Sequence, residues 1–146
     1  PVLRALGDRV VQVGKPGAGT VVKLVNQLLV GVHTAVAAEA LVFGVKAGAD
    51  PRALLDVIGT SFGASAMFNR TASLALQGGY DSGTDVRILK KDMALITDLG
   101  RHLGARMLLS NLAEQLFGEA DALGYGYNDM ISLIKPLERI AGVEVK

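Results

Sequence analysis

Apolar and polar positions follow a helical period over most of the chain, and glycine or proline separates the periodic segments. The longest segment runs from Gly19 to Ala47. Residues 16–17 precede it and residues 48–51 follow it, and both stretches contain helix-breaking residues. A helix of this length measures about 40–45 Å at roughly 1.5 Å per residue. The pattern therefore predicts one long helix at the start of a helical domain.

Five shorter helices are expected after the long one, each bounded by turn-forming residues. Their expected ranges are 51–59, 64–77, 86–103, 106–123 and 130–141. Asp50 is a good N-cap for the first of them, with Pro51 at its first helical position. Thr84 or Asp85 can cap the third.

The last expected helix has two features that define its shape. Asn128 or Asp129 can cap it, and Pro136 lies inside it. Because proline has no amide N–H and clashes with the preceding turn, Pro136 predicts a kink. With no internal repeat or low-complexity tract, these segments predict an all-α domain.

One segment before the long helix has the pattern of a strand. Val10, Val11 and Val13 form an apolar, β-branched run between two turn signals. A lone strand cannot satisfy its edges, so it needs a partner. If this chain supplies none, the partner belongs to a neighbouring domain or subunit. Residues 1–13 are therefore expected to be the end of another unit.

The centre of the long helix is apolar enough to resemble a membrane span. His33 and Glu39 lie inside it, and a central carboxylate costs several kcal/mol in hydrocarbon. We therefore predict a helix that is buried on most of its sides in a bundle, with small residues that allow close approach. These small residues are Gly31, Ala35, Ala37, Ala38, Ala40 and Gly44. Such a helix often needs a second subunit to cover it.

Composition narrows the possible chemistry. The chain has 146 residues, of which 50% are hydrophobic, and this is enough for one domain with a core. It has no cysteine, which excludes disulfides, thiolate catalysis and cysteine-ligated zinc, and its two histidines disfavour a histidine-rich metal site. A net charge of +1, no tryptophan and 5% aromatic residues disfavour a nucleic-acid partner.

A glycine-rich stretch, GKPGAG at residues 14–19, leads directly into the long helix. It matches neither GxxxxGK[ST] nor GxGxxG, so it is not a phosphate-binding loop of those kinds. The spacing favours a tight chain reversal that needs positive φ angles.

Three polar residues, Lys23, Asn26 and Gln27, stand at i, i+3 and i+4 and share one face of the long helix. A lysine partly surrounded by apolar side chains is suited to proton transfer, and the two amides can bind hydroxyl, carbonyl or carboxylate oxygens. Alternatively, the three residues form a solvated polar stripe with the lysine stem on the apolar surface. The residue pattern alone favours the stripe.

The other polar candidates also have simple structural interpretations. Lys90 and Lys91 precede Asp92 on an expected helix, where such a run is usually an exposed charged face. His33 and Glu39 are six residues apart, which places them on different faces and argues against a metal site. His102 lies near a helix C-terminus, where the helix dipole favours its charged form, and we interpret it as structural. (The run 90–92 could instead bind a phosphate or a carboxylate.)

Three linked motifs favour a functional rather than a structural interpretation of these polar residues. GKPGAGTVVKLVNQLL, AEALVFGVKAGADP and LKKDMALITDLG resemble, in order and spacing, the C-terminal half of the β-hydroxyacid dehydrogenase family. The family includes 3-hydroxyisobutyrate dehydrogenase, tartronate semialdehyde reductase and threonate dehydrogenase. The resemblance implies a helical bundle like the C-terminal domain of 6-phosphogluconate dehydrogenase. Residues 1–14 would end a Rossmann domain, and residues 15–146 would be the helical substrate and dimerisation domain.

The resemblance also implies roles for individual residues. In the pattern G-x-G-x-x-x-K-x-x-N, Lys23 would be the catalytic general acid/base and Asn26 a substrate-binding residue. Gln27 would be a second substrate-binding residue. It stands where many members have a second Asn, and it is similar to the variant found in members like tartronate semialdehyde reductase. Lys91, followed by Asp92, would lie close to the cofactor, with Lys90 as an extra basic neighbour.

The function implied is that of a dehydrogenase that uses NAD or NADP to oxidise a small hydroxy acid or to reduce the matching oxo acid. The cofactor would be bound mainly by the Rossmann domain, so this chain alone is expected to be inactive. No metal, nucleic acid or membrane is expected to take part. The protein is expected in the cytoplasm as a homodimer or higher homo-oligomer. The alternative is a non-catalytic helical homodimerisation module in which Lys23 is only a surface residue.

Overall fold

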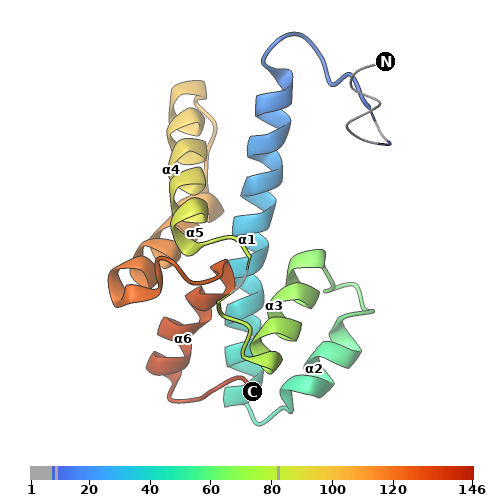
Figure 1. Ribbon diagram of the computed structural model, residues 1–146, viewed down its shortest axis with the longest axis vertical. Coiled ribbons are helices and arrows are strands. Elements are labelled where there is room, and N and C mark those ends of the chain that lie inside the picture. Colours follow the sequence, from blue (N-terminus) through green and yellow to red (C-terminus); the bar gives the residue numbers. More distant parts are fainter. Residues whose placement is uncertain (1–7, 9, 82) are drawn as a thin grey trace.

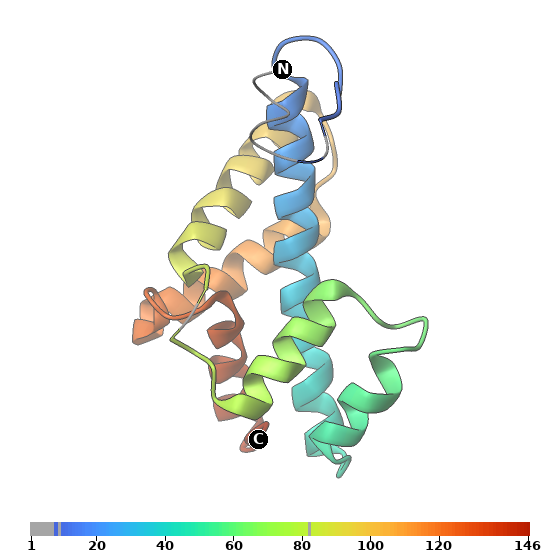
Figure 2. The same ribbon diagram turned by 45° about the vertical axis from the view of Figure 1, so that its right-hand side comes forward.

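A computed structural model describes residues 8, 10–81 and 83–146, and these form helices and turns without a strand. The six α-helices are α1 (Ala18–Lys46), α2 (Pro51–Ile58), α3 (Ala66–Gln77), α4 (Val86–Leu103), α5 (Leu108–Ala120) and α6 (Ile134–Ala141). Figure 1 shows that α1 runs the length of the bundle, with α4 beside its N-terminal half. The shorter helices α2, α3 and α6 lie around its C-terminal half (Figure 2). The all-α prediction is confirmed.

The helix boundaries follow most of the predicted caps and breakers, although Asp85, which precedes α4, makes no side-chain capping hydrogen bond. Asp50 Oδ1 accepts a hydrogen bond from the Ala53 amide at 2.9 Å, as expected for the N-cap of α2. α4 has the predicted bounds and ends at Gly104, which has a φ of 69°. α5 begins two residues later than expected and continues into a π-helical turn, Asp121–Tyr125. Local signals were therefore sufficient for most of the boundaries.

The last predicted helix is divided in two. Asp129 caps it by accepting a hydrogen bond from the Ile131 amide at 3.0 Å, and a 3-10 turn follows over Met130–Leu133. The α-helix α6 begins only after this turn. Pro136 is the third residue of α6, where a missing N–H is tolerated. The last predicted helix is thus interrupted ahead of the proline, where a 3-10 turn gives way to α6, and the kink predicted from Pro136 is not recorded within α6.

The strand predicted at Val10, Val11 and Val13 is wrong for this chain. These valines are exposed and have no regular secondary structure. Within the described residues, the one β-type pairing is an isolated bridge between Asp85 and Asp129, so no neighbouring strand is present to pair with the valines. Residues 1–7 and 9 lie outside the described residues, and so does most of the segment predicted to end a preceding domain.

The core is built around the C-terminal half of α1. Its buried apolar residues are Ala35, Ala37, Ala38, Leu41 and Val42. A Cβ added to Gly31 would lie 2.5 Å from Met93 Sδ, and one added to Gly44 would lie 2.5 Å from Leu54 Cδ1. The small residues on α1 therefore allow close packing as predicted, except for Ala40, which is exposed.

The N-terminal half of α1 is different. Val21, Val25 and Leu29 are 53%, 51% and 48% exposed, because among the described residues mainly α4 lies beside this half. The prediction that α1 is buried on most of its sides is therefore wrong for its first turns. By length and composition alone α1 could cross a membrane, and 39% of its most apolar window is buried in the bundle.

Candidate functional site

The glycine-rich stretch before α1 is a tight turn. Gly14 and Gly17 have φ angles of 142° and 95°, which L side chains rarely adopt. The Ala18 amide donates to the Lys15 carbonyl oxygen at 3.0 Å, and α1 starts immediately afterwards without a side-chain cap. The predicted chain reversal is confirmed. It places residues 23–27 in the second and third turns of α1.

The polar face of α1 meets α4. Gln27 Nε2 donates to Asp92 Oδ2 at 2.8 Å, and Lys91 Nζ lies 2.9 Å from Asp92 Oδ1. On α1, Asn26 Nδ2 donates to Gln27 Oε1 at 3.2 Å. Two motifs far apart in the sequence are thus joined at one place. We call Lys23, Asn26, Gln27, Lys91 and Asp92 the polar cluster.

Asp92 is the buried member of the polar cluster, with an exposed fraction of 4%. Burial raises its pKa, but hydrogen bonds from Lys91 and Gln27 and the charges of Lys91 and Lys23 outweigh burial. The pKa of Asp92 consequently lies below its ordinary value. The charge of Lys23 also lowers the pKa of Asp92, so Lys23 interacts electrostatically with the rest of the polar cluster.

The structure distinguishes the two adjacent lysines of α4. Lys90 Nζ lies 2.8 Å from Asp121 Oδ2, and Arg87 Nε contacts the other oxygen of the same carboxylate at 2.8 Å. Asp121 follows α5, on another side of α4 from the polar cluster. Lys91, the lysine chosen from the motif, is therefore the one that joins the predicted site residues.

The polar cluster is open to solvent. Lys23 and Asn26 are exposed, and the Lys91 side chain is 63% exposed. The partial burial expected for Lys23 is therefore wrong within the described chain, because its apolar neighbours Val21 and Val22 are exposed too. Two ammonium groups and two amides on one open surface can bind an oxygen-rich anion. Excluding water from it would need a further covering surface.

Sequence reasoning did not single out Asp92 as a site residue. The available signal was its position on α4, where Leu89, Met93 and Ile96 form the buried face. Asp92 follows Leu89 by three residues and precedes Ile96 by four, so it lies on that same face. A carboxylate at a core-facing position needs a partner, and that partner was on a different helix.

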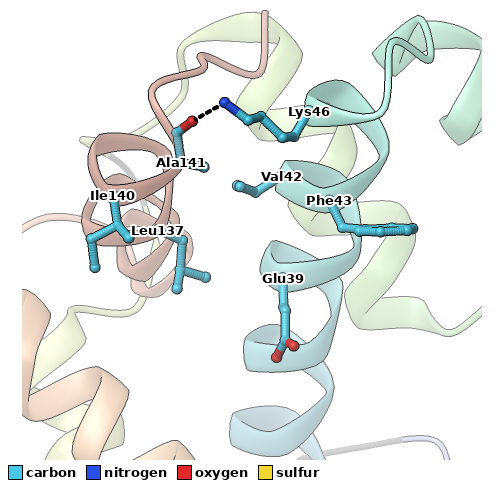
Figure 3. A pocket seen from close by; sticks show the side chains of 7 residues that line it. All are labelled: Glu39, Val42, Phe43, Lys46, Leu137, Ile140 and Ala141. Carbon is cyan, nitrogen blue, oxygen red and sulfur yellow. Dashed lines mark hydrogen bonds between the residues drawn. The ribbon is translucent and has the colours of Figure 1, made fainter.

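Several hollows of the described surface are mainly apolar, and no residue of the polar cluster lines them. Figure 3 shows one of about 260 Å³ between α1 and α6, lined by Glu39, Val42, Phe43, Lys46, Leu137, Ile140 and Ala141. His33 lines a different hollow beside α2 and α3, so His33 and Glu39 occupy different faces, as predicted. Among the described residues, no three His, Asp or Glu side chains gather as a metal centre requires.

An apolar groove of about 150 Å³ lies on the same turns of α1 as the polar cluster. It runs between α1 and α4 and is lined by Val21, Leu24, Val25, Leu28, Ile96, Leu99, Gly100, Leu103, Ala105 and Met107. The polar cluster is thus bordered by exposed apolar surface. Exposed Lys23 and Asn26 agree with the solvated polar stripe that the residue pattern alone favoured, whereas the hydrogen bond from Gln27 to the buried Asp92 carboxylate does not.

Residues 17–137 match the sequence model of a protein family described as NAD-binding of NADP-dependent 3-hydroxyisobutyrate dehydrogenase. The chain is 42% identical over 135 residues to the L-threonate dehydrogenase of Cupriavidus necator, covering 92% of this chain and 46% of that protein. It is 37% identical over 146 residues to the 2-(hydroxymethyl)glutarate dehydrogenase of Eubacterium barkeri, covering 99% and 48%.

A solved structure has the same fold. The crystal structure of a 3-hydroxyisobutyrate dehydrogenase from Salmonella typhimurium superimposes with a TM-score of 0.88 at 35% identity, over 92% of this chain and 48% of that chain. The chain therefore spans about half the length of the relatives it matches.

Proposed function

Because the chain belongs to the β-hydroxyacid dehydrogenase family, we propose that it is the helical half of an NAD(P)-dependent dehydrogenase acting on a small hydroxy acid. The observation that carries this proposal is the polar cluster. The Gln27–Asp92 hydrogen bond spans 65 positions in the sequence and brings Lys91 next to the face of Lys23 and Asn26. A solvated stripe would not need a buried carboxylate at its centre.

Lys23 is the proposed general acid/base. In the oxidation direction its Nζ accepts the proton of the substrate hydroxyl, and in the reduction direction Nζ returns a proton to the carbonyl oxygen. Asn26 binds the substrate through its amide, whose carbonyl oxygen makes no described hydrogen bond within the chain. Gln27 holds the Asn26 amide in place from the next position of the helix.

Lys91 is the residue of this chain that suits the cofactor. Its ammonium carries three N–H donors and makes one described ion pair, with Asp92, while its side chain is 63% exposed. It can therefore hold a negatively charged or carbonyl group of a dinucleotide. A nicotinamide dinucleotide, when bound, supplies the hydride chemistry that no side chain can provide.

A covering domain is part of the proposal. The polar cluster is open, and hydride transfer needs a site from which water is excluded. The apolar groove beside it offers a surface on which another domain can pack. Since the relatives are about twice as long as this chain, we propose that a dinucleotide-binding domain completes the site. Residues 1–14 would be its end, and the chain alone would be inactive.

The second candidate is a non-catalytic homodimerisation module. It is favoured by the exposed apolar side chains of Phe43 and Ile140, which are 73% and 78% exposed and line the hollow in Figure 3. Both candidates predict a homodimer or higher homo-oligomer, and we place either one in the cytoplasm. Sedimentation therefore cannot separate them, whereas activity can.

The test uses a fusion in which this chain replaces the C-terminal half of the L-threonate dehydrogenase of Cupriavidus necator. NAD(P)-dependent oxidation of L-threonate, glycerate and 3-hydroxyisobutyrate is measured for the fusion, for the parent enzyme and for the chain alone. We expect turnover of at least one substrate by the fusion and none by the chain alone. A folded fusion without turnover, beside an active parent, favours the dimerisation module. Turnover by the chain alone contradicts the need for a covering domain.

A further inference from the structure

Asp92 occupies a position that packing alone does not explain. It is 4% exposed and lies on the α4 face formed by Leu89, Met93 and Ile96. A carboxylate there costs free energy unless it is paired and hydrogen-bonded. Apolar side chains that replace a buried charge together with its partners often cause no loss of stability. The role of Asp92 therefore depends on the contacts of its carboxylate.

Both carboxylate oxygens of Asp92 are engaged, and they fix the orientation of two amides. An ionised carboxylate only accepts hydrogen bonds, so Gln27 must turn its NH₂ group toward α4, where it donates to Oδ2 at 2.8 Å. The Gln27 carbonyl oxygen then faces Asn26 and accepts from its Nδ2 at 3.2 Å. Oδ1 meanwhile holds Lys91 Nζ at 2.9 Å. One buried charge thus orders side chains on two helices.

We propose that Asp92 is a positioning residue, which holds Gln27 and Lys91 across the α1–α4 contact. Because Gln27 accepts a hydrogen bond from Asn26, Asp92 also orients the Asn26 amide, which lies on the same helix face as Lys23, the proposed general acid/base. The inference rests on the proposed function, because it assumes that Lys23 and Asn26 meet the substrate. Asp92 itself is buried, so it acts through its two partners.

The charges around Asp92 agree with this role. Lys91 and Lys23 are the cations that act on it, and both favour its ionised form. Lys90 is engaged on another side of α4 by Asp121. The pKa of Asp92 lies below its ordinary value despite burial, so the carboxylate is charged near neutral pH and can orient its partners.

The first test measures geometry in the chain itself. The side-chain amide signals of Gln27 and Asn26 are followed by ¹H–¹⁵N NMR as the pH is lowered. We expect both signals to shift with the titration of Asp92 and to lose this dependence in Asp92→Asn. The matched control Asp121→Asn removes the ion pairs on the other side of α4 and should leave both signals unchanged. Amide signals that are identical in Asp92→Asn and the unsubstituted chain would overturn the proposal, whether or not the protein is an enzyme.

The second test measures turnover in the fusion described above. Asp92→Asn is expected to lower kcat by about 10- to 100-fold, because the reacting groups lose their alignment. KM for the hydroxy acid should change much less, and Asp121→Asn should leave both constants unchanged. Asp92→Glu keeps the charge and should recover part of kcat, which covers the case in which Asp92→Asn folds poorly.

These outcomes separate the inference from the proposed function. An active fusion whose kcat is the same in Asp92→Asn and Asp121→Asn overturns the positioning role and leaves the dehydrogenase proposal standing. An inactive unsubstituted fusion counts against the dehydrogenase proposal, and the NMR experiment then decides whether Asp92 orders the amides.

Discussion

The two halves of α1 have similar apolar compositions but different surroundings. Residues 31–46 carry the core of the bundle, with Ala38 and Leu41 at 0% and 1% exposure. Residues 18–30 lie mainly beside α4, and Val25 and Leu29 in this half are about half exposed. The candidate site residues Lys23, Asn26 and Gln27 are all in the exposed half.

This difference assigns separate tasks to the two halves of one helix. The buried half anchors α1 in the bundle, because small residues there let the neighbouring helices approach closely. The exposed half has a polar face beside an apolar groove, a combination that is typical of a surface on which another domain packs. Both halves belong to one rigid helix, so packing of the buried half in the core also determines the position of the polar face.

The largest effect expected on stability comes from truncating the buried half. Leu41→Ala removes a side chain that is 1% exposed and leaves a cavity, which should lower the free energy of unfolding by about 2–5 kcal/mol. Leu29→Ala is the matched control, since Leu29 is 48% exposed and should cost less than about 1 kcal/mol. Urea denaturation of both variants checks this. Equal losses would contradict the division of α1 into two halves.

An ion pair near the core should matter more than one at the surface. Arg70 contacts both oxygens of Asp129, which is 1% exposed, at 2.9 and 2.5 Å. Arg70→Ala leaves that carboxylate buried without its cation, which should cost about 3 kcal/mol. Arg101→Ala, which breaks an exposed pair with Asp98, should cost less than about 1 kcal/mol. Thermal unfolding of the two variants should therefore differ clearly, and a similar change in Tm would count against the prediction.

A smaller effect is expected at α2 and α3, two helices beside the buried half that begin with side-chain caps, which α1 lacks. Ser65 Oγ accepts from the Phe68 amide at 2.9 Å at the start of α3. Ser65→Ala should lower the free energy of unfolding by about 1 kcal/mol. Ser61→Ala is the control, because Ser61 is exposed and donates to the Val57 carbonyl oxygen without capping a helix. The prediction fails if the two alanine variants unfold at the same urea concentration.

The smallest expected effect is a pH dependence at Asp92, the buried carboxylate of α4 that contacts the exposed half of α1. Because the pKa of Asp92 is lower in the folded protein than its ordinary value of 3.8, its ionised form stabilises the fold above about pH 4. This contribution is lost as the pH falls through the lowered value. Between pH 5 and pH 3, the unsubstituted chain should therefore lose more stability than Asp92→Asn. Asp98→Asn, at an exposed position, should behave like the unsubstituted chain. Parallel losses in all three would contradict the pKa direction.

Sequence reasoning located the helices because their ends are local features. Asp50, Gly78 and Gly104 determine where helices start or stop through hydrogen bonds within a few residues. The motif around Lys23 was likewise readable, because i, i+3 and i+4 spacing places side chains on one face whatever packs against it.

The sequence could not predict which residues of different helices contact one another. The Gln27–Asp92 bond joins positions 65 apart, and although the core-facing position of Asp92 indicates that it needs a partner, no neighbouring residue identifies Gln27 as that partner. The exposure of Val25 and Leu29 also depends on which helices pack against them. The apolar pattern predicted that they are buried, but the described helices leave both about half exposed. The strand at Val10–Val13 failed for the same reason, because its partner would have to come from elsewhere.

The most direct measurement of the central claim, that the exposed half of α1 carries the reaction, is kcat for Lys23→Ala in the fusion. Loss of a general acid/base should lower kcat by about 10²- to 10⁴-fold, with the same Tm as the unsubstituted fusion, because Lys23 is exposed. Lys15→Ala, an exposed lysine just before α1, should keep full activity. A Lys23→Ala fusion that turns over as fast as the Lys15→Ala fusion would contradict the claim.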